Sequence, residues 1–204
     1  MNKDNKYTEL LKKQICEVQK ENRSLEFKSN YQEADKLGQY ISALSNGACL
    51  DHQDFAYLYF GIDDSTLEVK GTKFNVSAIK AKGNQALEMY LRQLIFPHIP
   101  FMFEEFYYEG DKRVVRLKIP AAAGEPTTFY NKPYVRVDSH VTELSKYPEW
   151  MREIYSSRYD WTAQLVEDAT INDLDPEAIQ IAREGYKERY PQYEDQLSQW
   201  SDEI

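Results

Sequence analysis

Two basic side chains at alternating positions of an expected strand are candidates for binding phosphate. Arg116 and Lys118 lie in an expected strand, 114–119, and Val115 and Leu117 are their immediate neighbours. Because successive side chains of a strand point to opposite faces, the two cations share one face. Such a row can contact successive phosphates, with an affinity that falls steeply with salt. An ordinary solvated sheet face is the alternative, and these residues alone favour it.

Charged residues also gather in a short expected strand, Leu25–Lys28. The same alternation places Glu26 and Lys28 on one face, where their simplest role is an ion pair at a solvated edge. Lys28 is still a further candidate for phosphate contact, as is Arg136 in an expected strand, 134–137. Both residues therefore join Arg116 and Lys118 as candidate phosphate ligands.

Common sequence motifs for metal binding, nucleotide binding and nucleophilic catalysis are missing from the sequence. Cys49 and His52 stand three apart, whereas His98 and His140 are isolated. A structural zinc site normally needs four convergent ligands, so no structural metal is expected. The sequence also lacks the Gly-x4-Gly-Lys-Ser/Thr phosphate loop, and Ser139 beside His140 is too little to indicate a Ser/His/Asp arrangement.

Four tyrosines could stack on bases: Tyr107, Tyr108, Tyr130 and Tyr134. All four lie in or beside expected strands, where aromatic side chains more often pack in the core or across strands. Base stacking is therefore the less favoured of the two roles.

The charge of the chain is unevenly distributed along its length. The formal net charge is −9, which at first argues against a nucleic-acid partner. Residues 161–204 hold 11 acidic and 3 basic residues, whereas residues 1–160 hold 23 and 22. We therefore expect one domain over 1–158 and an acidic helical extension or linker over 159–204. The near-neutral main body can still present a basic face.

Hydrophobic patterning predicts an α+β (mixed α/β) fold, with a largely antiparallel or mixed sheet flanked by helices. The strand 55–62 is apolar at both parities, as in a central strand covered on both faces. A further pair of strands is expected at 127–130 and 134–137, and Asn46–Gly47 is expected to end the second helix. Expected helices cover about 5–19, 33–45, 84–95 (capped by Asn84), from Pro148 and from Asp175–Pro176; other expected strands cover 25–28, 67–70, 101–108 and 114–119.

Four sequence blocks, taken in order, carry a resemblance to a known family. They are Glu21-x4-Glu26-Phe27-Lys28, Ile41–Gly47, Tyr57–Asp64 followed by Val69–Thr72, and Tyr134–Ser139 followed by Thr142. Over roughly residues 10–145 the chain resembles the AlbA_2 domain of the Schlafen superfamily, which in bacteria often precedes other domains of transcriptional-regulator-like proteins. The loop 46–54 departs from the family pattern, because it is longer and lacks a double glycine.

The resemblance implies a module that binds DNA or RNA within a bacterial transcriptional regulator. It favours phosphate contact over a solvated sheet face for Lys28, Arg116, Lys118 and Arg136. Two cysteines cannot form a disulfide framework, and no stretch approaches the roughly 18 apolar residues of a membrane span. We therefore expect a cytoplasmic protein with no membrane contact.

The resemblance also implies an alternative, because some eukaryotic Schlafens are ribonucleases that use three acidic residues. In this sequence, the residues at the positions of those three acids are Glu21, Glu26 and, most nearly, Asp64. Three carboxylates can hold Mg²⁺ or Mn²⁺, which activates water. The other role for Asp64, with Asp63, is in a hairpin turn. We expect binding rather than catalysis, hence no cofactor, and keep a metal-dependent nuclease as the alternative.

A second alternative is a protein-interaction module. The amphipathic N-terminal helix and the acidic extension could mediate dimerisation, and two-fold homodimers are the commonest oligomers. Solution mass and nucleic-acid titration together discriminate this alternative from the other two.

Overall fold

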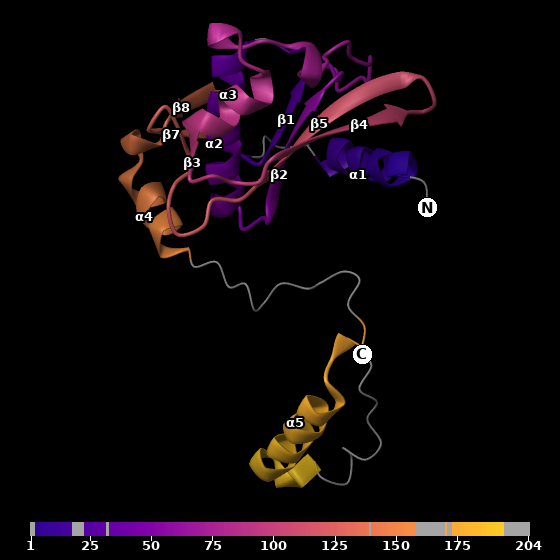
Figure 1. Cartoon of the computed structure of the whole chain (residues 1–204), viewed down its shortest axis with the longest axis vertical. Helices are drawn as coiled ribbons and strands as arrows, with labels where there is room; N and C mark the ends of the chain where they lie inside the picture. Colours follow the sequence, from indigo (N-terminus) through magenta and orange to yellow (C-terminus); the bar gives the residue numbers. More distant parts are fainter. Residues whose placement is uncertain are drawn as a thin grey trace. The chain divides into compact units, whose positions relative to one another are not determined.

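A computed structural model describes residues 3–17, 23–31, 33–138, 140–157, 170 and 173–193 (Figure 1). The chain forms two compact units, Met1–Tyr159 and Asp160–Ile204. The first unit contains all the predicted site residues, and its architecture is the mixed α+β one that the sequence predicts.

The main sheet of the first unit has four strands in the order β1 (Leu25–Lys28), β2 (Phe55–Phe60), β5 (Lys112–Pro120) and β4 (Met102–Tyr108). Strands β1 and β2 are parallel, and the other two pairings are antiparallel. The sheet is thus mixed, as predicted. Strand β1 forms one of its edges.

Strand β2 is covered on both faces, which confirms the prediction from its two-sided apolar pattern. Ala56 and Leu58 pack in the main hydrophobic core with helix α2 (Ala34–Leu50). Tyr59, on the opposite face, packs in a second core with Leu11 of helix α1 (Lys3–Glu17).

A second, antiparallel sheet runs in the order β3 (Ile95–Phe96), β6 (Thr128–Phe129), β7 (Lys132–Val137) and β8 (His140–Glu143). Strands β6 and β7 are the pair predicted at 127–130 and 134–137. Two residues with positive φ, Tyr130 and Asn131, make the tight turn between them. Strand β8 was not predicted.

The prediction that Asn46–Gly47 ends the second helix is wrong, because α2 continues to Leu50. Asn46 is fully buried and makes tertiary hydrogen bonds instead of a turn. Its Nδ2 donates to the carbonyls of Thr127 and Tyr134, each at 2.8 Å, and its Oδ1 accepts from the Thr127 amide at 2.8 Å. These bonds tie α2 to the second sheet.

Gly47 is required by close packing rather than by a helix end. A Cβ atom at Gly47 would lie 2.3 Å from the carbonyl oxygen of Arg23, well inside any real contact distance. The backbone just before β1 can therefore approach α2 only because position 47 has no side chain.

Two other element predictions are wrong because local turns intervene. The expected strand 67–70 does not form, because a turn at Asp63–Leu67 precedes it; Oδ1 of Asp63 accepts from the amides of Ser65 and Thr66 at 3.1 and 3.0 Å. Only the isolated bridge Ile62–Val69 remains there. Asn84 does not cap a helix, because it lies in a 3₁₀ turn with a φ of 60°, and α3 (Leu87–Leu94) begins after Ala86.

The helix predicted from Pro148 is α4 (Pro148–Ser156), which buries Ile154 in a third, smaller core. In the second unit, α5 (Pro176–Arg189) begins at the predicted cap, since the Asp175 carboxylate accepts from the Glu177 amide at 2.8 Å. Within the described part of the chain, no helix is long and apolar enough to cross a membrane.

Candidate functional site

Glu26 lies at the edge strand of the main sheet between two basic side chains. Its Oε1 is 2.5 Å from Nζ of Lys28, on the same strand. Its Oε2 is 2.7 Å from Nη2 of Arg136, on β7 of the second sheet. Glu26 and Arg136 are each 7% exposed. Burying a charge is costly unless it is paired, so this arrangement must form together with the junction of the two sheets.

Arg136 also anchors the backbone of β1, because its Nη1 donates to the carbonyl of Leu25 at 2.7 Å. Its guanidinium therefore holds both the side chain of Glu26 and the strand that carries it. This fixed position makes Arg136 a support for Glu26 rather than a surface group.

Lys28 extends the same chain of charges toward solvent. Its Nζ lies 3.5 Å from Oδ2 of Asp64, whose side chain is 62% exposed, and 5.6 Å from the ring centre of Tyr40. Burial opposes its charge, but the hydrogen bond and the attraction of Glu26 outweigh burial and raise the pKa of Lys28. Four predicted residues thus form one ion-paired group, the edge cluster: Glu26, Lys28, Asp64 and Arg136.

Arg116 and Lys118 lie elsewhere, on the face of the sheet that α1 partly covers. Arg116 is 5% exposed, and its Nε donates to Oε2 of Glu104 at 2.6 Å. The ring of Tyr7, on α1, lies 3.7 Å from the guanidinium carbon of Arg116, and the Tyr7 hydroxyl donates to Glu104 at 2.7 Å. Arg116 is therefore buried beneath Tyr7 of α1 and paired with Glu104, so it does not form an open row with Lys118.

Lys118 remains partly exposed beside aromatic side chains. Its Nζ is 3.6 Å from the ring centre of Phe55, and it forms no ion pair with any carboxylate that the structure describes. The predicted basic residues are thus divided between two places. Lys28 and Arg136 lie in the edge cluster, and Arg116 and Lys118 lie on the α1 face.

The described residues do not fit the divalent cation that the nuclease alternative requires. Glu21 lies outside the described residues. Of the other two predicted acids, Glu26 has each oxygen against a cation, and the ammonium of Lys28 already lies between Glu26 and Asp64. Among the residues described, no group of three His, Cys, Asp or Glu side chains could hold a metal ion.

The four tyrosines proposed for base stacking differ in exposure. Tyr107 and Tyr130 are 50% and 47% exposed, whereas Tyr108 and Tyr134 are partly buried against hydrophobic cores. Of the four, only Tyr107 and Tyr130 present large exposed rings.

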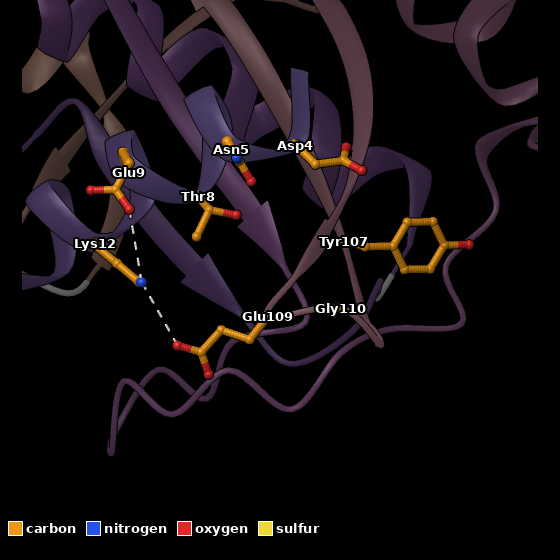
Figure 2. Close-up of a pocket in the computed structure, with 8 residues that line it drawn as sticks. All are labelled: Asp4, Asn5, Thr8, Glu9, Lys12, Tyr107, Glu109 and Gly110. Carbon is orange, nitrogen blue, oxygen red and sulfur yellow. Dashed lines mark ion pairs between the residues drawn. The ribbon is translucent and has the colours of Figure 1, made fainter. Parts of the chain in front are cut away.

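A wide cavity of about 610 Å³ lies between α1 and the turn that joins β4 to β5 (Figure 2). Three carboxylates line it: Asp4, Glu9 and Glu109. Among its described lining residues only Lys12 is basic, and its Nζ lies 3.8 Å from the carboxylates of both Glu9 and Glu109. Because carboxylates repel phosphates, this acidic cavity is a poor nucleic-acid site.

Four lysines outside the predicted set occupy the long loop between β2 and α3. They are Lys70, Lys73, Lys80 and Lys82, and no acidic residue occurs between Glu68 and Glu88. We call residues 69–87 the basic loop. The sequence contains a signal for the basic loop, because a segment with four lysines and no acidic residue is unusual in a chain with a net charge of −9.

Comparison with known families supports the resemblance carried by the sequence blocks. The family model described as Schlafen, AlbA_2 matches residues 21–145, more than half of the chain. This chain belongs to the Schlafen AlbA_2 family. The match contains the whole edge cluster and the basic loop. No curated protein sequence matches the chain.

Two solved structures are similar to this AlbA_2 chain at low identity. The DIP2311 protein from Corynebacterium diphtheriae is 19% identical, with a TM-score of 0.43. The match covers 97% of this chain and 36% of the DIP2311 chain. The N-terminal domain of a RecG-related protein from Nitrosomonas europaea is 16% identical, with a TM-score of 0.38. The match covers 56% of this chain and 72% of that domain's chain. This chain thus spans just over a third of the DIP2311 chain, and the family assignment rests on the sequence match.

Proposed function

We propose that this AlbA_2 domain binds nucleic acid, DNA or RNA, through phosphate contacts at the edge cluster. The observation that supports this most directly is the convergence of Glu26, Lys28, Asp64 and Arg136 from three separate sequence blocks. Lys28 lies between Glu26 and the mostly exposed Asp64, on the solvent side of the buried pair that Glu26 forms with Arg136.

The proposed roles within the cluster follow from burial. Lys28, at the solvent side, is the residue that contacts a phosphate. Glu26 and Arg136 are positioning residues, since both are buried and Arg136 holds Glu26 and the β1 backbone in place. Asp64 is mostly exposed and releases Lys28 when a phosphate competes for it.

Binding of this kind is tolerant of sequence. A lysine ammonium acts as a point charge on phosphate, and phosphate contacts carry no base information. We therefore propose that further domains of a transcriptional-regulator-like protein supply any sequence preference. A cytoplasmic setting is part of this proposal and agrees with two free cysteines, Cys16 and Cys49.

Fluorescence anisotropy with labelled single- and double-stranded DNA and RNA tests the proposal, at two salt concentrations, with and without Mg²⁺ or Mn²⁺. We expect salt-sensitive binding with intact substrate on a gel. Lys28→Gln weakens binding to all sequences alike and makes the salt slope shallower by about 0.7 to 1. Lys28→Arg keeps the charge and retains most of the affinity.

The matched control is Lys146→Gln, since Lys146 is an exposed lysine of the same unit and lies outside the edge cluster. Lack of binding to every substrate contradicts the proposal. Metal-dependent cleavage that Glu26→Gln abolishes would support the nuclease alternative instead. A dimer that ignores nucleic acid would support the interaction module.

A further inference from the structure

We infer that the basic loop and Tyr130 form a track for a single-stranded polynucleotide, with phosphates on the lysines and an unpaired base on the tyrosine ring. This inference rests on the proposed function. It adds the path of the strand beyond Lys28 and the kind of nucleic acid that fits.

The charge of the basic loop is concentrated and directed outward. All four of its lysines are exposed, and the side chains of Lys70 and Lys82 are 50% and 67% exposed. Lys73 and Lys80 form no ion pair with a described carboxylate, so their charge is available to a ligand. The apolar residues of the loop point the other way, with Phe74 buried in the main core.

The loop is held in place by the body of the domain. The ring of Phe74 stacks on Tyr31 with centroids 4.9 Å apart. Nη1 of Arg113, on β5, donates to the carbonyls of Phe74 and Thr72 at 2.6 and 3.2 Å. The lysines therefore project from a fixed segment, so ordering them on a strand costs less conformational entropy than on a mobile loop.

The basic loop lies next to the edge cluster, and the two form one surface. Oγ1 of Thr72 donates to Oδ1 of Asn30 at 3.1 Å, two residues after Lys28. Lys28, Tyr31 and Lys36 line the same small pocket. Lys36 is exposed, and the structure pairs it with none of the described carboxylates. Lysines thus continue from Lys28 past the start of α2.

Tyr130 marks the far end of this surface. Its hydroxyl lies 2.8 Å from the hydroxyl of Tyr90, which in turn hydrogen-bonds to Asp35. Asp35 also accepts from Nζ of Lys82 at 2.5 Å, and this ammonium lies 6.0 Å from the Tyr130 ring centre. An exposed ring and a cation are therefore fixed side by side, and Asp35, which accepts from Lys82, directly precedes Lys36.

The backbone conformation of Tyr130 belongs to the tight turn between β6 and β7. Its φ is 51°, in the left-handed region that non-glycine residues seldom adopt. Glycine would make the same turn at lower cost, so the ring can be removed at this position without disturbing the turn.

This combination selects single strands over duplexes. Bases in a duplex are stacked on one another, whereas an unpaired base has a free face for an aromatic side chain. Stacking tolerates any base, and the lysines contact only phosphate. Single-stranded DNA and RNA share this chemistry, and separate DNA and RNA oligonucleotides distinguish them by affinity.

The test is anisotropy of the full chain with labelled single strands and the matching duplexes across a salt series. We expect tighter binding to single strands. The double variant Lys73→Gln/Lys80→Gln makes the salt slope shallower by about 1.4, because each neutralised phosphate of a single strand contributes about 0.7. Tyr130→Gly removes the ring, suits the positive φ and weakens single-strand binding about tenfold.

Matched controls are Lys112→Gln/Lys146→Gln and Tyr107→Ala, which change accessible lysines and an exposed tyrosine elsewhere in the unit. Unchanged binding by both loop variants, with Lys28→Gln still impaired, overturns this inference and leaves the proposed function intact. Equal affinity for duplexes overturns the preference for single strands. Absence of all binding by the unaltered chain overturns both proposals.

Discussion

The guanidinium of Arg136 on β7 lies 2.7 Å from the carboxylate of Glu26 on β1, so a buried ion pair joins the two sheets. The two residues are 110 positions apart in the sequence, and neither is more than 7% exposed. This pair holds the edge cluster together and positions Glu26 against Lys28, which lies between Glu26 and the exposed Asp64.

Removal of Arg136 is expected to destabilise the first unit. Arg136→Met leaves Glu26 buried with only Lys28 as a partner and removes the hydrogen bond to Leu25. Removing one partner of a buried ion pair typically lowers the free energy of unfolding by about 3–5 kcal/mol. Urea denaturation of Arg136→Met measures this loss. Lys132→Met, which breaks the exposed pair with Glu143, should cost less than about 1 kcal/mol. Equal losses would contradict a special role for Arg136.

Gly47 is expected to tolerate no side chain. In Gly47→Ala the new Cβ would lie 2.3 Å from the Arg23 carbonyl, so β1 or α2 must shift. Overpacking of this kind typically costs about 1–3 kcal/mol. The same change at Gly185 in α5 meets open space and should favour the helix by up to about 1 kcal/mol. Thermal unfolding followed by circular dichroism measures both, and a neutral Gly47→Ala would show that α2 and β1 can separate freely.

Loss of the Asn46 side chain should loosen the contact between α2 and the second sheet. Asn46→Ala leaves the amide of Thr127 without its acceptor and removes two donors to backbone carbonyls. Each unsatisfied buried group costs about 1–3 kcal/mol. Hydrogen exchange is the direct measurement, since the Thr127 amide should lose protection while the amides of β2 keep more of theirs. Gln53→Ala, at an exposed site, is the control.

The stability of the first unit should fall in acid partly through Glu104. Burial raises the pKa of this carboxyl, but hydrogen bonds from Arg116 and Tyr7 outweigh burial and bring the pKa below its ordinary value of 4.5. A carboxyl whose pKa is lowered in the folded state stabilises the fold at any pH above its ordinary pKa. This stabilisation is lost as the pH falls through the lowered pKa.

Urea denaturation between about pH 6 and about pH 3 checks this assignment. Glu104→Gln should unfold more easily at pH 6 and show a shallower decline with acid than the unaltered chain. Asp111→Asn, at an exposed turn, should leave the decline unchanged. A decline of the same steepness in Glu104→Gln would assign the acid sensitivity to other carboxylates.

Much of the fold could be predicted from the sequence, because its signals are local. The two-sided apolar run at 55–62 predicted a central strand, and Asp175–Pro176 predicted the start of a helix. Predictions failed where a distant contact overrides a local preference. Asn46–Gly47 is a common helix end, but here buried hydrogen bonds and the approach of Arg23 keep both residues inside α2.

The amino-acid sequence was enough to predict the family, the mixed α+β class and the residue types of the candidate site. Which of these residues contact one another could be seen only in the folded arrangement. It joined Lys28, Glu26, Asp64 and Arg136, and it buried Arg116 beneath Tyr7. Strand alternation fixes which face a side chain takes, but the partner across that face comes from a remote segment. Pairing and burial of charge therefore depend on how the sheets and helices pack.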